Sequence, residues 1–338
     1  MLNVSQQSPE RYQLFSEFLP DDQAQDLRRC AEQFGPFEMY IQGPVKEGFG
    51  AGLVRRHDAA MNYMKGLKSP SEAQHLMARL NLFRGTYALH DELRQPLAAP
   101  MLRSETFREA AAKLTGRPLV RPAMLYANLL LPGQELPIHT DTPEYRGIDK
   151  WNMPEWFLVV MMHSGLFEDW RKFVTAGVAF FGDCEAGEFV LYADGPTGDA
   201  TRVPVKSNTA IHLDVDGIFH GVQRVGGADT APPPLAPGMT LSFGGDNTWH
   251  LRSGDELVRD YDWSELRYSV QWKANCFANA EEEALVESHA DDLTVQGVIE
   301  SLVEDLRSRE RIAGERPNDT ALAMLMMNEY IRFPPPML

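Results

Sequence analysis

A change in the spacing of apolar residues near residue 121 constrains the fold more than any other feature of this sequence. Before it, apolar residues recur three and four positions apart behind Asp or Ser, which predicts amphipathic helices. The stretches with this spacing are residues 21–34, 69–80 and 104–116. After it come short runs rich in β-branched and aromatic residues, separated by Gly, Asp and Asn, which predict strands joined by turns. These runs are residues 123–131, 177–183, 187–195, 201–208, 209–215 and 266–277.

Helical spacing returns after residue 278, in residues 280–293, 295–312 and 319–331. Helices, then roughly eight strands, then helices predict an α+β fold with a jelly-roll core of antiparallel strands, braced at both ends by helices. We expect one compact unit of three regions: a mostly helical support, a strand-rich catalytic core, and C-terminal helices with an apolar tail. These regions are residues 1–120, 121–277 and 278–338.

A proline-rich stretch, GGADTAPPPLAPG, interrupts the strand region from Gly226 onward. Proline has no N–H to donate to a neighbouring strand, so this stretch is unsuited to a sheet interior. We interpret residues 226–262 as an insertion between two strands. With Trp249 and the apolar C-terminal residues Ile331 and Phe333, we expect it to close as a lid over the barrel mouth, where jelly-roll folds keep small ligands.

The composition excludes two classes of partner. Acidic residues outnumber basic ones, 48 to 32, for a formal charge of −16, and such a surface repels nucleic acids and anionic membranes. No signal peptide is visible, and the apolar run WFLVVMM is too short to span a bilayer. The three cysteines are odd in number and far apart, which favours a reducing cytoplasm over a disulfide framework. We expect a cytoplasmic enzyme with a small-molecule substrate.

A His-x-Asp pair on a strand places an imidazole and a carboxylate on one side, as a non-haem iron site requires. His139-Thr140-Asp141 has this form, and residues 212–214 and 289–291 share it. The last of these lies in an acidic, helix-like segment near the C-terminus. The pair at 212 could use His250 as the second imidazole, but only 38 residues separate them, and part of that span is the proline-rich stretch. We therefore favour His139 and Asp141.

The second imidazole should follow a turn and lie on a late strand. His220 does so, because Asp216-Gly217 is a turn signal and the residues after it alternate. Between His139 and His220 there is room for several strands.

A dicarboxylate co-substrate needs a permanently charged, planar donor, which is arginine. Arg267 lies on the next predicted strand, and Ser269 shares its face. The competitor is Arg224, four residues after His220.

The order of these motifs, HxD, then His-Gly-Val, then Arg-x-Ser, resembles the iron(II)/2-oxoglutarate-dependent oxygenase superfamily over about residues 121–277. The resemblance implies a double-stranded β-helix, iron(II), and 2-oxoglutarate and O2 as co-substrates. The iron ligands that it implies are His139, Asp141 and His220.

The same resemblance implies roles around the co-substrate. Arg267 would pair with the distal carboxylate of 2-oxoglutarate, with Ser269 assisting. Tyr126 and Asn128, on the strand before the metal pair, resemble positions that touch the co-substrate. A fainter similarity, in layout alone, links the chain to oxygenases that oxidise valine-like amino acids, including aziridine-forming ones. The reaction on the substrate is left open between hydroxylation, desaturation and ring closure.

Two other functions remain open from the sequence. A zinc hydrolase could use the same two histidines and one aspartate, but it would need no dicarboxylate anchor. A non-catalytic jelly-roll binding protein would have no reason to keep all of these residues together.

Overall fold

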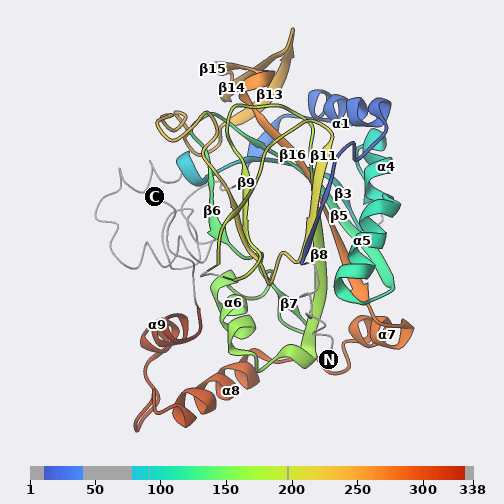
Figure 1. Cartoon of the computed structure of the whole chain (residues 1–338). Helices are drawn as coiled ribbons and strands as arrows, with labels where there is room; N and C mark the ends of the chain where they lie inside the picture. The colour runs from blue at the N-terminus through green and yellow to red at the C-terminus, as the bar shows by residue number, and fades with distance from the viewer. Residues whose placement is uncertain (1–10, 41–77, 91, 196–197, 332–338) are drawn as a thin grey trace, which may run out of the picture.

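Two antiparallel sheets form the core of the protein (Figure 1). The computed structural model describes residues 11–40, 78–90, 92–195 and 198–331. The small sheet has the order β10-β9-β12-β6, with bounds β6 (Leu136–His139), β9 (Phe189–Tyr192), β10 (Thr201–Val203) and β12 (Phe219–Val222). The large sheet has the order β1-β11-β8-β16-β5-β3-β2-β13-β14-β15, with β4 paired to β3 and β7 paired to β8.

The strands of the large sheet have these bounds: β1 (Tyr12–Phe15), β2 (Phe37–Met39), β3 (Phe83–Leu89), β4 (Glu92–Leu93), β5 (Leu119–Leu130), β7 (Glu144–Tyr145), β8 (Arg171–Phe180), β11 (Thr209–Leu213), β13 (Thr240–Gly245), β14 (Thr248–Ser253), β15 (Glu256–Asp262) and β16 (Arg267–Phe277).

The strand order identifies the core as a double-stranded β-helix. Four adjacent strands of the large sheet, β11-β8-β16-β5, and the four strands of the small sheet together make the eight strands of the core. The chain passes from β5 to β6, β8 and β9, and from β10 to β11, β12 and β16, so it crosses repeatedly from one sheet to the other. This is the eight-stranded jelly-roll arrangement. The prediction of an α+β fold with a jelly-roll core is confirmed.

Helices pack on the large sheet and at one end of the molecule (Figure 1). Their bounds are α1 (Asp21–Gln33), α4 (Ala99–Leu102), α5 (Glu105–Thr115), α6 (Glu155–Ser164), α7 (Ala280–Ser288), α8 (Val295–Ser308) and α9 (Asp319–Tyr330). One apolar cluster joins α1, α4 and α5 to the large sheet, and a second holds α6, α8 and α9 together. None of the helices described is long and apolar enough to cross a membrane.

The predicted helices that fall on described residues are confirmed within a few residues at each end, whereas most of residues 69–80 lies outside the described part. Two corrections are needed. The N-terminal region also contains strands, because β1, β2 and β3 extend the large sheet. Helix α6 was not predicted, because its sequence EWFLVVMMHS is apolar on nearly every side and shows no helical periodicity.

Residues 226–262 do not loop out of the core. Within them, β13, β14 and β15 form an antiparallel meander, and β13 pairs with β2 through Thr240 and Leu241. The segment therefore adds three strands to the large sheet beyond β2, at the edge opposite β1. It is an insertion between β12 and β16 in sequence, as predicted, but it is an ordered part of the sheet.

Strand β11 carries a buried histidine that should make stability sensitive to acid. His212 is 1% exposed and its Nε2 lies 3.0 Å from Thr175 Oγ1. Burial lowers the pKa of His212 from 6.5 to about 3. The folded protein therefore holds this imidazole neutral, and the stability that follows is complete above pH 6.5 and is lost as the pH falls toward 3.

We expect His212→Gln to reduce the loss of unfolding free energy between pH 7.5 and pH 5 by about 2 kcal/mol relative to wild type. Urea unfolding at the two pH values measures this difference. An unchanged loss in the variant would show that His212 does not govern acid sensitivity.

Candidate active site

The end of β6 places the first two candidate metal ligands. His139 is the last residue of the strand, and Asp141 follows it after the buried Thr140. The backbone N–H of Asp141 donates to Val215 O at 2.8 Å, which fixes the carboxylate against the chain that leads into β12. The i, i+2 spacing thus brings the imidazole and the carboxylate together, as the sequence predicts.

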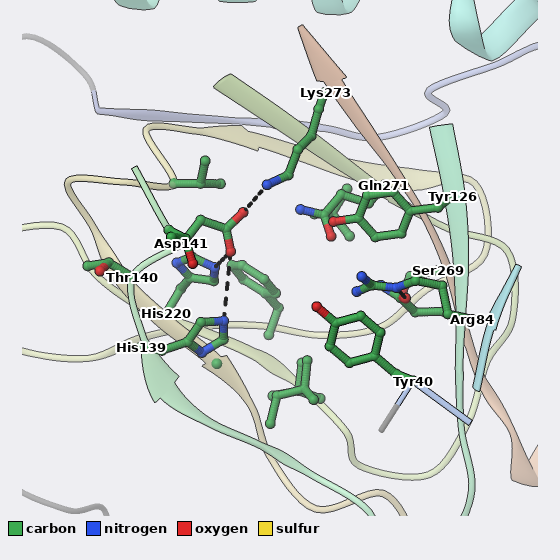
Figure 2. A pocket seen from close by; sticks show the side chains of 18 of the residues that line it. Tyr40, Arg84, Tyr126, His139, Thr140, Asp141, His220, Ser269, Gln271 and Lys273 are labelled. Atoms are coloured by element: carbon green, nitrogen blue, oxygen red, sulfur yellow. Dashed lines mark hydrogen bonds and ion pairs between the residues drawn. The ribbon is translucent and has the colours of Figure 1, made fainter. Parts of the chain in front are cut away.

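The third candidate ligand comes from the neighbouring strand. His220 on β12 lies directly opposite His139 in the strand register. The Nε2 atoms of His139 and His220 lie 3.8 and 3.7 Å from Asp141 Oδ1, and the ring centroids are 4.7 Å apart. Candidate ligand atoms of all three residues lie within 4.8 Å of one another. Figure 2 shows the three side chains converging on one side of the cavity.

Hydrogen bonds on the far side of each imidazole fix its tautomer. His139 Nδ1 lies 2.6 Å from Pro137 O, and His220 Nδ1 lies 2.9 Å from Ile218 O. A carbonyl oxygen only accepts, so each Nδ1 carries the proton and donates it. In the neutral imidazole each Nε2 then carries a lone pair on the side of Asp141, which is the usual arrangement around ligating histidines.

The second oxygen of Asp141 belongs to a buried ion pair. Lys273 Nζ lies 2.6 Å from Asp141 Oδ2, and both side chains are less than a fifth exposed. Burial alone would raise the pKa of Asp141, but the Lys273 ammonium and the two imidazoles outweigh it and hold that pKa well below its usual value. Oδ1 therefore belongs to an ionised carboxylate and faces the imidazoles, so it is a candidate ligand atom.

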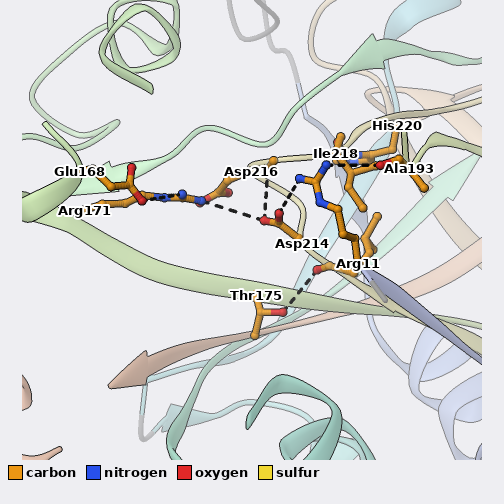
Figure 3. A network of polar contacts seen from close by, with 11 residues as sticks. Arg11, Glu168, Arg171, Thr175, Ala193, Asp214, Asp216, Ile218 and His220 are labelled. Carbon is orange, nitrogen blue, oxygen red and sulfur yellow. Dashed lines mark hydrogen bonds and ion pairs between the residues drawn. The ribbon is translucent and has the colours of Figure 1, made fainter. Parts of the chain in front are cut away.

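A polar network holds the turn before β12, and with it His220 (Figure 3). Arg11 Nη2 donates to Asp214 Oδ2 at 2.8 Å, and Gly217 N donates to Asp214 Oδ1 at 3.2 Å. Arg171 Nη2 lies 3.6 Å from Asp216 Oδ2. Burial raises the pKa of Asp216 well above its usual value despite the nearby arginine. The network fixes the chain that presents Ile218 O to His220.

Strand β16 lines the cavity with every second residue. Arg267, Ser269, Gln271 and Lys273 face inward, and the intervening residues pack in the apolar cluster under the helices. Two of those outward residues secure helices, because Tyr268 Oη donates to Leu27 O and Trp272 Nε1 donates to Leu102 O. The period of two in a strand thus divides β16 into a polar wall and an apolar anchor.

Arg267 has the features of an anchor for a buried anion. It is 2% exposed, its Nε donates to Gly187 O at 2.8 Å, and its Nη1 donates to Ser269 Oγ at 3.2 Å. Its Nη2 is buried without a hydrogen-bond partner, and no carboxylate among the described residues pairs with it. Burial lowers the pKa of Arg267 to about 10, so the guanidinium is still charged near neutral pH. An uncompensated buried charge is costly unless a ligand neutralises it.

The other two predicted co-substrate residues, Tyr126 and Asn128, also line this cavity. Both lie on β5 and are 6% exposed, and Asn128 lies opposite Ser269 in the register of β5 and β16. The cavity has a volume of about 130 Å³ and holds polar groups at the metal cluster and at Arg267. Apolar side chains between them include Val178, Phe189 and Leu213.

The rival residues lie elsewhere. His250, on β14, pairs with Asp260 at 2.6 Å in the meander, and His289 caps α7 at the surface. His212 faces Phe107 and Trp272 on the other side of the large sheet.

Arg224 donates to Glu135 Oε2 at 3.1 Å and does not line the cavity. It is thus already paired with a carboxylate, unlike Arg267.

The prediction of a lid over the cavity is wrong, because none of the described residues assigned to it lines the cavity. Trp249 is fully buried in the apolar core beside Phe37, Phe243 and Trp263, and no residue of 226–262 lines the cavity. Ile331 is buried in the cluster of α6, α8 and α9. Phe333 lies outside the described residues.

Sequence reasoning missed several polar side chains of the cavity, among them Tyr40, Arg84, Gln271 and Lys273. Gln271 and Lys273 continue the even offsets from Arg267, so the pattern of β16 contained the signal for them. Arg84 and Tyr40 lie in a region predicted to be mostly helical, and no pattern in the sequence linked them to the site.

No protein-family model and no curated protein matches the sequence. Solved structures with a similar fold are found. A 2OG-Fe(II) oxygenase-family oxidoreductase from Burkholderia pseudomallei is 9% identical with a TM-score of 0.41, over 79% of this chain and 88% of that one. A Trichoplax adhaerens prolyl hydroxylase, in complex with a peptide, is 10% identical with a TM-score of 0.42, over 81% and 86%. HygX from Streptomyces hygroscopicus, with nickel and 2-oxoglutarate bound, is 9% identical with a TM-score of 0.39, over 79% and 84%. Members of the 2OG-Fe(II) oxygenase family thus recur among the solved structures to which this chain is similar.

Proposed function

We propose that this chain is an iron(II)- and 2-oxoglutarate-dependent oxygenase that oxidises a C–H bond of a small molecule. One observation carries the proposal: a two-histidine, one-aspartate cluster shares a cavity with a buried arginine whose Nη2 has no partner among the described residues. Two imidazoles and one carboxylate with open positions are typical of non-haem iron(II) oxygenases. A charged fork at the other end of the cavity suits the distal carboxylate of a dicarboxylic acid.

The residues fit the groups that this function requires. His139 and His220 present Nε2 lone pairs and Asp141 presents Oδ1, so these three atoms would hold the metal. Arg267, with Ser269 beside it, would hold the distal carboxylate of 2-oxoglutarate. Bound iron(II), with 2-oxoglutarate and O2, supplies the oxidation of a C–H bond, with succinate and CO2 as co-products.

The protein would orient the metal ligands and limit the access of water to the cavity. Hydrogen bonds to Pro137 O and Ile218 O orient the imidazoles, and Lys273 holds Asp141 so that one oxygen faces them. Apolar residues of the cavity, among them Val178, Phe189 and Leu213, would limit water near a bound substrate, which strengthens electrostatic interactions and limits side reactions.

Two features weigh against the alternatives. A zinc hydrolase could use the same three ligands, but it has no use for a buried, unneutralised guanidinium in the same cavity. A jelly-roll protein that only binds a ligand has no need for two imidazoles whose tautomers are fixed toward a carboxylate.

The test is whether the purified protein converts 2-oxoglutarate to succinate. We expect iron(II)-dependent succinate, above the protein-free background, even without the natural substrate, and no succinate when zinc(II) replaces iron(II). Quantifying succinate by NMR with each metal separates the alternatives. Absence of succinate with iron(II), together with zinc-dependent ester or amide hydrolysis, would support the hydrolase instead.

A further inference from the structure

We infer that Arg84 binds a carboxylate of the substrate that is oxidised, and that this substrate is a small carboxylic acid. The inference rests on the function proposed above, and it assigns the substrate class. Four cationic side chains line the cavity: Arg84, Lys150, Arg267 and Lys273.

Two of these cations lie near an anion of the protein, and the proposed function assigns an anion to a third. Lys273 pairs with Asp141 at 2.6 Å. Lys150 Nζ lies 3.9 Å from Glu144 Oε1, a carboxylate that it shares with Lys172 at 3.1 Å. Arg267 is assigned to the distal carboxylate of 2-oxoglutarate.

Arg84 differs from them, because no carboxylate among the described residues pairs with it. Its Nε donates to the neutral amide oxygen of Asn128 at 3.0 Å. The cavity therefore contains a guanidinium that is not neutralised by the described protein.

The guanidinium of Arg84 is held in a fixed plane. It lies 3.9 Å from the ring centroid of Tyr40 and 4.2 Å from that of Tyr126, so the two rings stack on its faces. The hydrogen bond to Asn128 occupies one edge of the group. Figure 2 shows Arg84 pointing into the cavity from the wall opposite His139 and Asp141. A planar fork fixed in this way can donate two parallel hydrogen bonds to a carboxylate with little loss of side-chain entropy.

The co-substrate does not supply that carboxylate. 2-Oxoglutarate has two carboxylates, one in the keto-acid end that faces the metal and one assigned to Arg267. Arg84 lies opposite Asn128 on β5, and Asn128 lies opposite Ser269 on β16, so two strand spacings separate Arg84 from the Arg267 strand. A third carboxylate in the cavity must come from the substrate.

The experiment uses nickel(II)-loaded full-length protein, which binds without oxidative turnover. Calorimetric titration first measures 2-oxoglutarate, then a panel of α-amino and α-hydroxy acids, each paired with its primary amide. For at least one pair we expect the acid to bind wild type ten or more times more tightly than the amide. Arg84→Gln should abolish this preference and leave 2-oxoglutarate affinity within twofold of wild type. Arg84→Lys should keep part of the preference.

Arg28→Gln is the matched control. Arg28 also donates to an asparagine amide oxygen, that of Asn247 at 3.0 Å, and its guanidinium lies 4.7 Å from the Trp263 ring centroid. It lies outside the cavity, so the acid preference should be unchanged in this variant.

Three outcomes would overturn the inference: no acid in the panel binds better than its amide, Arg84→Gln keeps the preference, or Arg84→Gln loses affinity for 2-oxoglutarate instead. Failure of the proposed function has a different signature, because wild-type protein would then not bind 2-oxoglutarate in the first titration.

Discussion

Replacing His139 or His220 by alanine should lower iron(II) affinity by at least about 100-fold and reduce succinate formation to the protein-free background. Each imidazole supplies one of the three proposed ligand atoms, and no other His, Cys, Asp or Glu cluster of this kind exists among the described residues. Both side chains face the cavity, so their loss should leave the thermal midpoint nearly unchanged. Competition titration with a metal-binding dye measures the affinity.

Asp141→Ala should lose metal to the same extent and also destabilise the fold. Lys273 would keep a buried ammonium without its partner at 2.6 Å, and removing one member of a buried ion pair costs on the order of 3 kcal/mol. Adding Lys273→Met to Asp141→Ala should restore much of the unfolding free energy but none of the metal affinity. This double variant separates the role of Asp141 as a ligand from its role in the ion pair.

His250→Ala is the control for the ligand assignment, because His250 pairs with Asp260 in the meander outside the cavity. Its metal affinity and succinate formation should equal those of wild type. An active His220→Ala protein beside an inactive His250→Ala protein would refute the proposed metal site.

The strand-borne part of the site follows from local periodicity alone. At the end of β6 and along β16 the candidate side chains are two residues apart in extended chain, so His139 with Asp141, and Arg267 with Ser269, face the same way. Helices α1, α5 and α8 were predictable for the same reason, because one stripe of each is apolar. Patterns that repeat within one element are visible in the sequence.

Pairing between distant elements is not visible in the same way. Nothing local in residues 240–245 reveals that β13 pairs with β2, more than 200 residues earlier in the sequence, so the meander resembled a loop insertion. The ion pair between Lys273 and Asp141 likewise joins residues that are far apart in the chain. Arg84 belongs to the site only because β3 pairs with β5. Such partners depend on register and packing, which single-sequence patterns do not encode.

Arg267→Ala should raise the dissociation constant of 2-oxoglutarate on the order of 100-fold while leaving metal affinity unchanged. The variant removes a buried fork whose Nη2 has no other partner among the described residues, and truncating one side of a buried charge pair costs several kcal/mol of binding. Arg267→Lys keeps the charge but loses the paired donors, so its affinity should be intermediate. Titration of 2-oxoglutarate into nickel(II)-loaded protein measures the dissociation constants of wild type, Arg267→Ala and Arg267→Lys.

A thermal readout gives the same comparison without turnover. A ligand that binds only the folded protein stabilises it in proportion to the logarithm of its concentration over its dissociation constant. Saturating 2-oxoglutarate should therefore raise the melting midpoint of the nickel(II)-loaded wild type and hardly change that of Arg267→Ala. Arg224→Ala is the matched control, because Arg224 is close to His220 in sequence but is paired with Glu135 outside the cavity. If Arg224→Ala loses 2-oxoglutarate binding and Arg267→Ala retains it, the co-substrate lies at a different wall of the barrel, and the unpartnered Nη2 of Arg267 serves another ligand.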